Sequence, residues 1–498
     1  MEPQRLKTWL TLLGVVNIVA FATYAVISYG LTPVMSLDVM NPAPRKAEIF
    51  GKLAQMIGFL GPGAQSFVSG QCALIRRGVF LLLYSLPLLI STGVFLALLI
   101  LLARYHRDLE SSTPKSLFRW AVIFAAISVL ASPTLVQDFW LSLAWGRMVA
   151  VGLNPYYTDL KPEFAQGFPL DYWFDQRMTY GPLWAVVAGI VMWLAGQHVL
   201  LATGLFKLLL AGAWVASLRV IWLLLQGRSL WHQCAGIGIF GWLPLSLNQT
   251  VADGHNDVFM GLFLLLWLYG LERKKTVWAS LSLAASALIK YVTAPLFLLD
   301  LLHLKYSKGR RLLEYFPQIM AASVLMAVTL GLFYRSPDFF TPTVSMGSWH
   351  FCSPSDSINA LGRLIGVNLK FLGSGVRAFF FLLPVYFIMR YTKQPSPEEF
   401  HEAVLAIISG MLFSVVGHVW PWFLLWVLGL IALIPGTALA RWGLGVALVM
   451  PFPFLVWTIF PFRDSFIIPS LLLFPLVVLW FVFAPSRWFP SGLKTSYK

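Results

Sequence analysis

The sequence predicts an all-α fold, a polytopic integral membrane bundle with about 13–14 membrane-spanning helices. Composition is the first observation, because the 498 residues are 58% hydrophobic, 15% aromatic and only 11% charged, whereas soluble domains carry roughly 25% charged residues. The second is that apolar runs of about 20 residues, long enough to cross a hydrocarbon core, recur along the chain. Lipid offers the backbone no hydrogen-bond partners, so such runs are expected to be helices.

The predicted spans follow one another without a linker that would mark a separate soluble domain. Residues 1–498 are therefore expected to form a single integral membrane domain. Several runs are short, and the segment 276–304 is also compatible with one broken hairpin. The spans are expected near residues 9–30, 78–103, 118–135, 200–225, 232–247, 257–271, 276–289, 291–304, 315–333, 373–390, 402–418, 421–437, 440–460 and 466–484.

The chain carries a formal net charge of +15, which in a soluble protein would suggest nucleic acid binding. In a membrane protein the simpler interpretation is that Lys and Arg line cytoplasmic loops and face anionic lipid. We therefore expect membrane lipid, and no nucleic acid, among the partners. The three cysteines, Cys72, Cys234 and Cys352, show no spacing typical of a metal site and no evident pairing. The first apolar run, 9–30, has the length of a retained anchor.

Positive charge near the span ends predicts the orientation of the chain. The basic N-terminus and segment 104–119 are placed inside. The short apolar run 182–197 then determines the orientation of all later segments. If it crossed the membrane, the basic segments 272–275 and 305–311 would lie outside. We therefore expect 182–197 to be re-entrant or interfacial. The predicted outer loops are 31–77, 136–181 and 334–372.

One acidic residue, Asp138, lies where the predicted span 118–135 meets the outer loop 136–181. An isolated acid at such a position is often a solvated helix end, but here a long aromatic loop follows it, which is compatible with a lid that holds a substrate. The loop contains a rigid turn and ends just before the short apolar run. Its candidate binding residues are Asn154, Tyr156 and Tyr180.

The stretch VADGHND at residues 251–257 gathers four polar side chains between two apolar runs. Gly254 permits a turn, and Asp257 could cap the next helix, but capping leaves the other polar residues unexplained. The predicted orientation puts this stretch on the same side as Asp138, so we expect it to form one wall of an outer polar cavity. The candidate contact residues are Asp253, His255, Asn256 and Asp257.

Further candidates on the predicted outer side are cations and aromatic side chains. Lys290 interrupts an apolar stretch, and a lysine there either snorkels to the interface or has a functional role such as pairing with a phosphate oxygen. The aromatic group at 418–422 either belongs to an interfacial belt or stacks on a sugar ring. Besides Lys290, the candidates are Tyr291, Arg335, His350, His418 and Trp422.

Five short motifs occur in a fixed order along residues 138–426. They are Asp138 with the following WGRMVAVGLNPY, YGPLW at 180–184, GHNDVFM at 254–260, ALIKYVTAPL at 287–296 and WPWFLLW at 420–426. This order on a multi-span chain resembles the polyprenyl-phosphate-sugar-dependent glycosyltransferases of the GT-C superfamily, and most closely the bacterial alpha-mannosyltransferases that elongate lipid-anchored mannans. The resemblance implies a GT-C-type fold with an outward-opening cavity and Asp138 as the catalytic residue.

The resemblance also implies a membrane glycosyltransferase that moves a sugar, most often mannose, from a polyprenyl-phosphate donor to a glycan or lipid acceptor. Such transfer passes through an oxocarbenium-like transition state. Asp138 is the expected base for the acceptor hydroxyl, and Lys290, His255 and Arg335 are candidate partners of the leaving phosphate. No cofactor is expected, although a divalent cation bound by Asp138, Asp253 and Asp257 stays open. The expected location is the bacterial plasma membrane, with the site facing the periplasm or cell exterior.

Two other functions stay open from the sequence. A transporter or flippase of lipid-linked sugars would also have many spans, but it should show pseudo-symmetric halves and a polar path to the inner side. The polar residues instead concentrate on one face, which favours an enzyme. A polymerase or ligase of lipid-linked glycans would rely on one large outer loop with paired arginines, and loop 334–372 carries Arg335 and Arg363.

Overall fold

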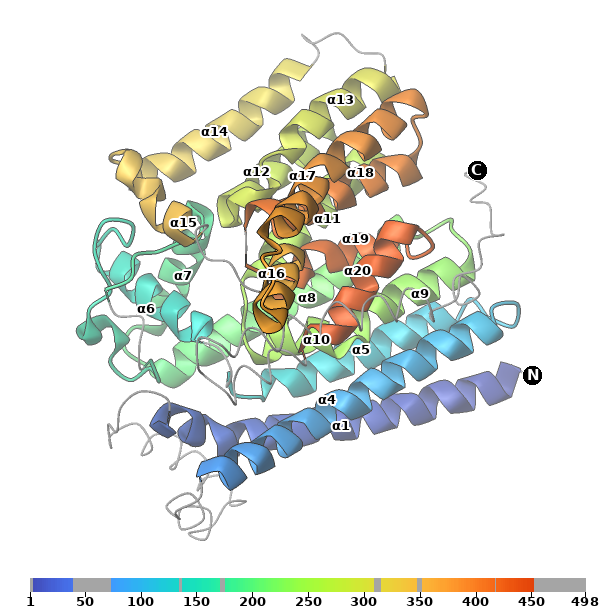
Figure 1. The fold of residues 1–498 in the computed structure, drawn as a ribbon, viewed down its shortest axis with the longest axis horizontal. Helices are drawn as coiled ribbons and strands as arrows, with labels where there is room; N and C mark the ends of the chain where they lie inside the picture. The colour runs from blue at the N-terminus through green and yellow to red at the C-terminus, as the bar shows by residue number, and fades with distance from the viewer. Residues whose placement is uncertain are drawn as a thin grey trace.

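The computed structural model describes residues 3–38, 73–133, 137–170, 175–308, 315–346, 352–416 and 418–451. Within these ranges the chain forms helices and no β-strand, which confirms the all-α prediction (Figure 1). The helices are α1 (Pro3–Asp38), α4 (Ala73–Arg104), α5 (Thr113–Val129), α6 (Asp138–Ala150), α7 (Pro182–Ala195), α8 (Val199–Leu224), α9 (Leu230–Gly241), α10 (Pro244–Leu247), α11 (Asp257–Glu272), α12 (Thr276–Ile289), α13 (Leu296–Lys308), α14 (Phe316–Phe333), α15 (Thr341–Met346), α16 (Pro354–Ile365), α17 (Lys370–Lys393), α18 (Pro397–Gly410), α19 (Leu425–Leu433) and α20 (Ala438–Val449).

Five of the described helices are long and apolar enough to cross a membrane, and they lie in α1, α4, α8, α14 and α17. Shorter apolar helices accompany them: α7, α12, residues Pro421–Leu433 and α20. The protein is therefore a polytopic helical membrane protein. The total of about 13–14 spans stays a prediction, and the expected span 466–484 lies outside the described residues.

Several helix ends differ from the predicted span ends. Helix α1 continues to Asp38 and α4 begins at Ala73, so both extend into the predicted loop 31–77, whose remaining residues 39–72 lie outside the described part. Helix α5 ends at Val129, short of the predicted limit at 135. Pro133 explains this early end, because the residue before a proline disfavours the helical conformation. Hydropathy marks the part of a helix that lies in lipid, not where the helix stops.

Helices that are close in the sequence pack side by side (Figure 1). Helices α1 and α4 lie side by side along one edge, α6 packs on α7, and α11 packs on α12 and α8. Helix α19, far along the chain, packs against α9 and α11. The largest fully buried side chains include Trp184, Trp214, Trp242 and Trp267. The core is therefore built from the central helices, and it surrounds the turn that carries the VADGHND stretch.

The predicted loop 136–181 contains a buried helix, α6, which lies closely against α7. Small residues permit this contact, since a Cβ at Gly146 would lie 2.5 Å from the Ala188 carbonyl oxygen and one at Gly189 would lie 2.6 Å from a Val149 methyl carbon. Helix α7 has 14 residues, or about 21 Å at 1.5 Å per residue, which is shorter than a hydrocarbon core of about 30 Å. Its re-entrant or interfacial placement stays a prediction.

Candidate active site

Asp138 lies in the first turn of α6, and two segments from elsewhere in the chain meet its carboxylate. The Tyr180 hydroxyl donates a hydrogen bond to Asp138 Oδ2 at 3.0 Å. His255 Nδ1 lies 3.6 Å from the same oxygen. The Asp138 side chain keeps 24% of its surface exposed, whereas that of His255 keeps 1%. The acid thus has one open side and one side fixed by protein.

Tyr180 reaches this position because the next residue, Gly181, lies directly against the end of α12. The Gly181 N–H donates to the Ile289 carbonyl at 2.9 Å. A Cβ at Gly181 would lie 2.1 Å from the Leu288 carbonyl oxygen, so only glycine fits. The same contact brings Tyr180 beside Lys290, which follows α12.

The VADGHND stretch forms a tight turn between two helical segments. A π-helical turn at Asn248–Ala252 includes the first two residues of the stretch, and such turns are frequent at functional sites. Gly254 has φ of +84°, which glycine adopts without a Cβ clash. A Cβ there would also lie 2.1 Å from Phe139 Cδ2. The turn predicted at Gly254 is therefore confirmed, and it packs directly against the residue after Asp138.

Asp257 begins α11, but its side chain bonds to distant residues rather than to the helix end. Lys290 Nζ donates to Asp257 Oδ1 at 2.6 Å, and the Trp426 indole N–H donates to the same oxygen. Asp257 is fully buried, and the Lys290 side chain is 9% exposed. This buried ion pair argues against the simple capping interpretation of Asp257.

Aromatic rings surround the Lys290 ammonium. Its Nζ lies 5.1 Å from the centre of the Tyr180 ring, 4.9 Å from that of Phe423 and 5.4 Å from that of Trp426. Such distances allow cation–π attraction, which strengthens when the cation is shielded from water. Lys290 does not snorkel to an interface, because it is held in a buried position by Asp257 and these rings.

A stack of rings borders the other side of the site. The His255 and Trp422 rings lie 4.1 Å apart with their planes at 11°, and Trp420 stacks on Trp422 at 4.9 Å. Stacking fixes the orientation of the imidazole, so that Nδ1 faces Asp138. The aromatic group at 418–422 therefore lies at the site rather than in a separate belt.

Many buried polar atoms around this turn have no hydrogen-bond partner among the described residues. They are Asn248 Oδ1, Gln249 Oε1, Thr250 Oγ1, His255 Nε2, both amide atoms of Asn256, and Asp257 Oδ2. Buried polar groups are normally paired, so this concentration favours a site that receives polar ligand atoms or water. The described residues contain no group of three or more His, Cys, Asp or Glu side chains placed to hold a metal ion.

Burial and nearby charges shift the protonation of the site residues. Burial raises the pKa of Asp138 to about 6, against the Tyr180 hydrogen bond and the Lys290 charge, which lower it. Burial, assisted by the Lys290 charge, holds the pKa of His255 well below its usual value, so its ring is neutral at pH 7. Burial and the neighbouring Asp138 carboxylate raise the pKa of Tyr180 well above its usual value. At neutral pH, Asp138 is thus a carboxylate beside two neutral hydrogen-bonding groups.

Other predicted site residues lie around the cluster rather than in it. The Asn154 amide donates to the Phe333 carbonyl at 2.7 Å, and the buried Tyr156 hydroxyl donates to the Tyr180 carbonyl at 2.8 Å. These two hydrogen bonds hold the loop that precedes Tyr180 against the end of α14 and against the Tyr180 backbone. The exposed Arg335 donates to the Gly331, Leu332 and Tyr334 carbonyls at the end of α14.

The structure also describes the surroundings of three further candidate residues, Tyr291, His418 and Asp253. The Tyr291 ring lies 5.7 Å from that of Phe340. His418 is 3% exposed and its ring lies 5.4 Å from that of Phe423. Asp253 is fully buried and accepts a hydrogen bond from Gln249 Nε2 at 3.3 Å. His350 lies outside the described residues.

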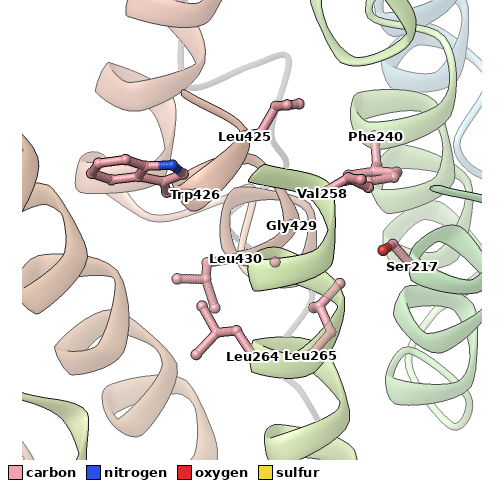
Figure 2. Close-up of a pocket in the computed structure, with 10 residues that line it drawn as sticks. Ser217, Phe240, Val258, Leu264, Leu265, Leu425, Trp426, Gly429 and Leu430 are labelled. Atoms are coloured by element: carbon pink, nitrogen blue, oxygen red, sulfur yellow. The ribbon is translucent and has the colours of Figure 1, made fainter. Parts of the chain in front are cut away.

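Sequence reasoning missed Phe423 and Trp426 as site residues. Trp426 is four positions after Trp422, a spacing that places two side chains on the same helical face, and this signal could have found it. Figure 2 shows Trp426 bordering a small apolar cavity between α8, α9, α11 and α19. With a volume of about 10 Å³, the cavity has room for about one water molecule and none for a sugar.

Together, the long apolar helices and the buried carboxylate, imidazole and ammonium groups define a polytopic membrane protein with one acidic, aromatic-lined site. Residues 48–303, just over half of the chain, match the model of the MptA_B family, described as alpha-(1->6)-mannopyranosyltransferase, N-terminal domain. The chain belongs to this family, and the protein is accordingly a glycosyltransferase of the mannosyltransferase type. No curated protein matches the chain.

The matched range contains Asp138, Tyr180, the VADGHND turn and Lys290. It ends before α19, which contributes Trp426. The site is therefore assembled from the matched N-terminal part and from a helix that follows it.

Proposed function

We propose that the protein transfers mannose from a polyprenyl-phosphate donor to a glycan or lipid acceptor on the outer face of the bacterial plasma membrane. Mannosyl transfer follows from membership of the family. The donor, the acceptor and the membrane face are what we propose in addition. The observation that carries it is that a partly exposed carboxylate, Asp138, and a buried cation, Lys290, both contact Tyr180, whose hydroxyl bonds to Asp138 and whose ring centre lies 5.1 Å from Lys290 Nζ. Acceptor activation and stabilisation of a leaving phosphate need these two charges.

In the proposed reaction, the acceptor hydroxyl oxygen attacks the anomeric carbon of the donor sugar while Asp138 removes the hydroxyl proton. The bond between the anomeric carbon and the phosphate oxygen breaks, and the electron pair leaves with the polyprenyl phosphate. Asp138 then returns its proton to solvent through its exposed side. One base and one displacement give inversion at the anomeric carbon, and the carboxylate form of Asp138 is the form that accepts a proton.

In the proposed reaction, Lys290 stabilises the charge that develops on the leaving phosphate. A fixed cation in a site shielded from water stabilises such charge more strongly than it would in solution. The Lys290 ammonium bonds to Asp257 through one donor, and His255 Nε2 has no partner among the described residues. Both nitrogens are therefore candidate contacts for phosphate or sugar oxygens.

A groove at the end of α6 opposite to Asp138 supports a lipid-borne donor. It has a volume of about 750 Å³ and lies between the end of α6, α7 and α14. Its walls include the exposed apolar side chains Ile190, Trp193 and Leu332, which can contact a prenyl chain. Tyr157 also lines it, next to Tyr156, whose hydroxyl bonds to the Tyr180 carbonyl.

The proposal is tested with purified protein in liposomes that contain a lipid-linked mannan acceptor. We expect label to move from radiolabelled polyprenyl-phosphate mannose and not from a nucleotide-linked mannose. Asp138→Asn should lower transfer by about 10²–10⁴-fold, as expected for loss of a general base, while donor binding is retained. Asp159→Asn is the matched control, because Asp159 lies in the same loop and pairs with Arg177 at 2.8 Å. Near-normal transfer by Asp138→Asn would remove the base assignment.

A further inference from the structure

A buried lysine that the reaction scheme does not use lies in the middle of α8. Lys207 is 3% exposed and belongs to a helix long and apolar enough to cross the membrane. A charged side chain in such a helix is energetically costly and persists where it has partners. Its partners therefore indicate why the position is a lysine.

The Lys207 ammonium bonds to two segments that are far apart in the sequence. Its Nζ donates to the Ala131 carbonyl and to the Ala252 carbonyl at 3.1 Å. The first carbonyl follows the end of α5 and the second closes the π-helical turn. Carbonyls at helix ends lack partners within the helix and carry partial negative charge, so one ammonium stabilises both ends.

Both bonded residues lie close in the sequence to residues of the site. Ala252 is followed by Asp253 and then by the Gly254 turn and His255. Ala131 is seven positions before Asp138, and residues 134–136 between them lie outside the described part. The neighbouring residue on α8, Phe206, packs its ring 5.2 Å from that of Phe139. Helix α8 thus contacts both segments whose approach brings His255 to Asp138.

We propose that Lys207 is a positioning residue that fixes the Asp138 segment and the VADGHND turn relative to each other. The inference rests on the proposed function only in treating these two segments as the reacting site. The Lys207 ammonium bonds to the backbone carbonyls of Ala131 and Ala252. It therefore acts on the reacting side chains through the backbone that carries them. An apolar residue of similar size could fill the space but could not bond to the two carbonyls.

The test combines amide hydrogen exchange with transfer kinetics in the full-length protein. In Lys207→Met, exchange should become about tenfold faster or more in peptides covering 130–133 and 249–257, because local opening exposes these amides, and stay unchanged in α17. The kcat for transfer should fall by about 10²-fold, the loss that a misplacement of about 1 Å can cause. Lys207→Arg, which keeps donors and charge, should recover most of both properties.

Two further variants separate positioning from simple loss of folding or charge. Ser217→Ala removes a buried hydrogen bond on the same helix and should leave transfer within about twofold of wild type, since point changes away from a site usually have small effects. Lys207→Met combined with Asp253→Asn leaves no buried charge at either position. This double variant should be more stable to unfolding than Lys207→Met alone, but it should show the same fast exchange and low kcat.

Unchanged exchange in both segments would overturn the inference, and so would a normal kcat in Lys207→Met or full recovery of kcat in the double variant. Failure of the proposed function has a different signature. It would show as absence of prenyl-phosphate-dependent transfer by the wild-type protein, whereas the exchange experiment needs no substrate.

Discussion

Lys290 and Asp257 form an ion pair that sets the electrostatic character of the site. Desolvation of two charges is costly, and their attraction offsets it only when the geometry is good and the remaining atoms find partners. Here Asp257 Oδ1 accepts hydrogen bonds from Lys290 and from the Trp426 indole and aromatic rings enclose the ammonium, while Asp257 Oδ2 has no partner among the described residues. Removal of either charge alone would leave the other buried and unpaired.

We therefore expect Lys290→Met and Asp257→Asn to destabilise the fold by about 3–5 kcal/mol each. The double variant should regain most of this stability, because no buried charge is left unpaired. All three variants should lose transfer activity, since the cation that we propose to face the leaving phosphate is absent or displaced. Thermal unfolding in lipid nanodiscs measures the stability. A double variant as unstable as the single variants, or one that keeps normal transfer, would contradict this role.

The individual site residues were only partly predictable from the sequence. The polar types and their positions at span ends identified Asp138, His255, Asp257 and Lys290 as candidates. The partner of Lys290 was not predictable, because Asp257 lies 33 residues away in the sequence and only packing of α11 on α12 brings them together. The bond of Trp426 to Asp257 was not predictable for the same reason, since it joins positions 169 residues apart, although the spacing of Trp426 from Trp422 was a signal that placed both on one helical face.

The turn that links the π-helical segment to α11 depends on one glycine for two reasons. Gly254 has a positive φ, and its missing Cβ leaves space for the Phe139 ring. The first reason is local and visible in the sequence as a turn signal. The second is a tertiary contact that connects the turn to α6, and no sequence pattern reveals it.

Gly254→Ala should therefore be more harmful than its backbone conformation alone predicts. Gly152 is the matched control, because its φ is also +84° and a Cβ there would meet nothing within 4 Å. Gly152→Ala should lower the free energy of unfolding by about 1–2 kcal/mol, because alanine is strained in the left-handed conformation. Gly254→Ala should lower the free energy of unfolding by more than this and should also lower kcat, since Phe139 and the adjacent Asp138 must shift. Unfolding and transfer measurements on both variants provide the comparison, and equal effects would argue against the Phe139 contact.

Helix existence was easier to predict than helix ends. The predicted span 276–289 coincides with α12, and 200–225 differs from α8 by one residue at each end. By contrast, the predicted span 232–247 is divided into α9 and α10 by the break before Pro244. Long apolar runs report burial in lipid or protein, whereas caps, prolines and tertiary contacts determine where each helix stops.

The arrangement of the whole chain bears on its orientation in the membrane. Asp138 and His255 are in contact, so both lie at the same depth, as the predicted orientation requires of the two segments. If α7 crossed the membrane, these segments would approach from opposite sides. The short length of α7 and its packing along α6 support a re-entrant or interfacial placement, which we retain as a proposal.

Cysteine labelling in intact cells checks this orientation. In a cysteine-free background, Lys161→Cys should react with a membrane-impermeant maleimide from outside, and Lys275→Cys should react only after permeabilisation. Both side chains are exposed, so accessibility to the reagent depends on the membrane side. Labelling of both positions from the same side would contradict the proposed orientation.

The pH dependence of kcat/KM for mannosyl transfer tests the assignment of Asp138 as the base. The pKa of Asp138 is raised to about 6 by burial, and only its carboxylate form accepts a proton. Activity should therefore be constant above this pH and fall about tenfold per pH unit below it, and the residual activity of Asp138→Asn should lack this dependence. A wild-type profile that stays flat well below pH 6, or an acid limb that persists in Asp138→Asn, would contradict the account.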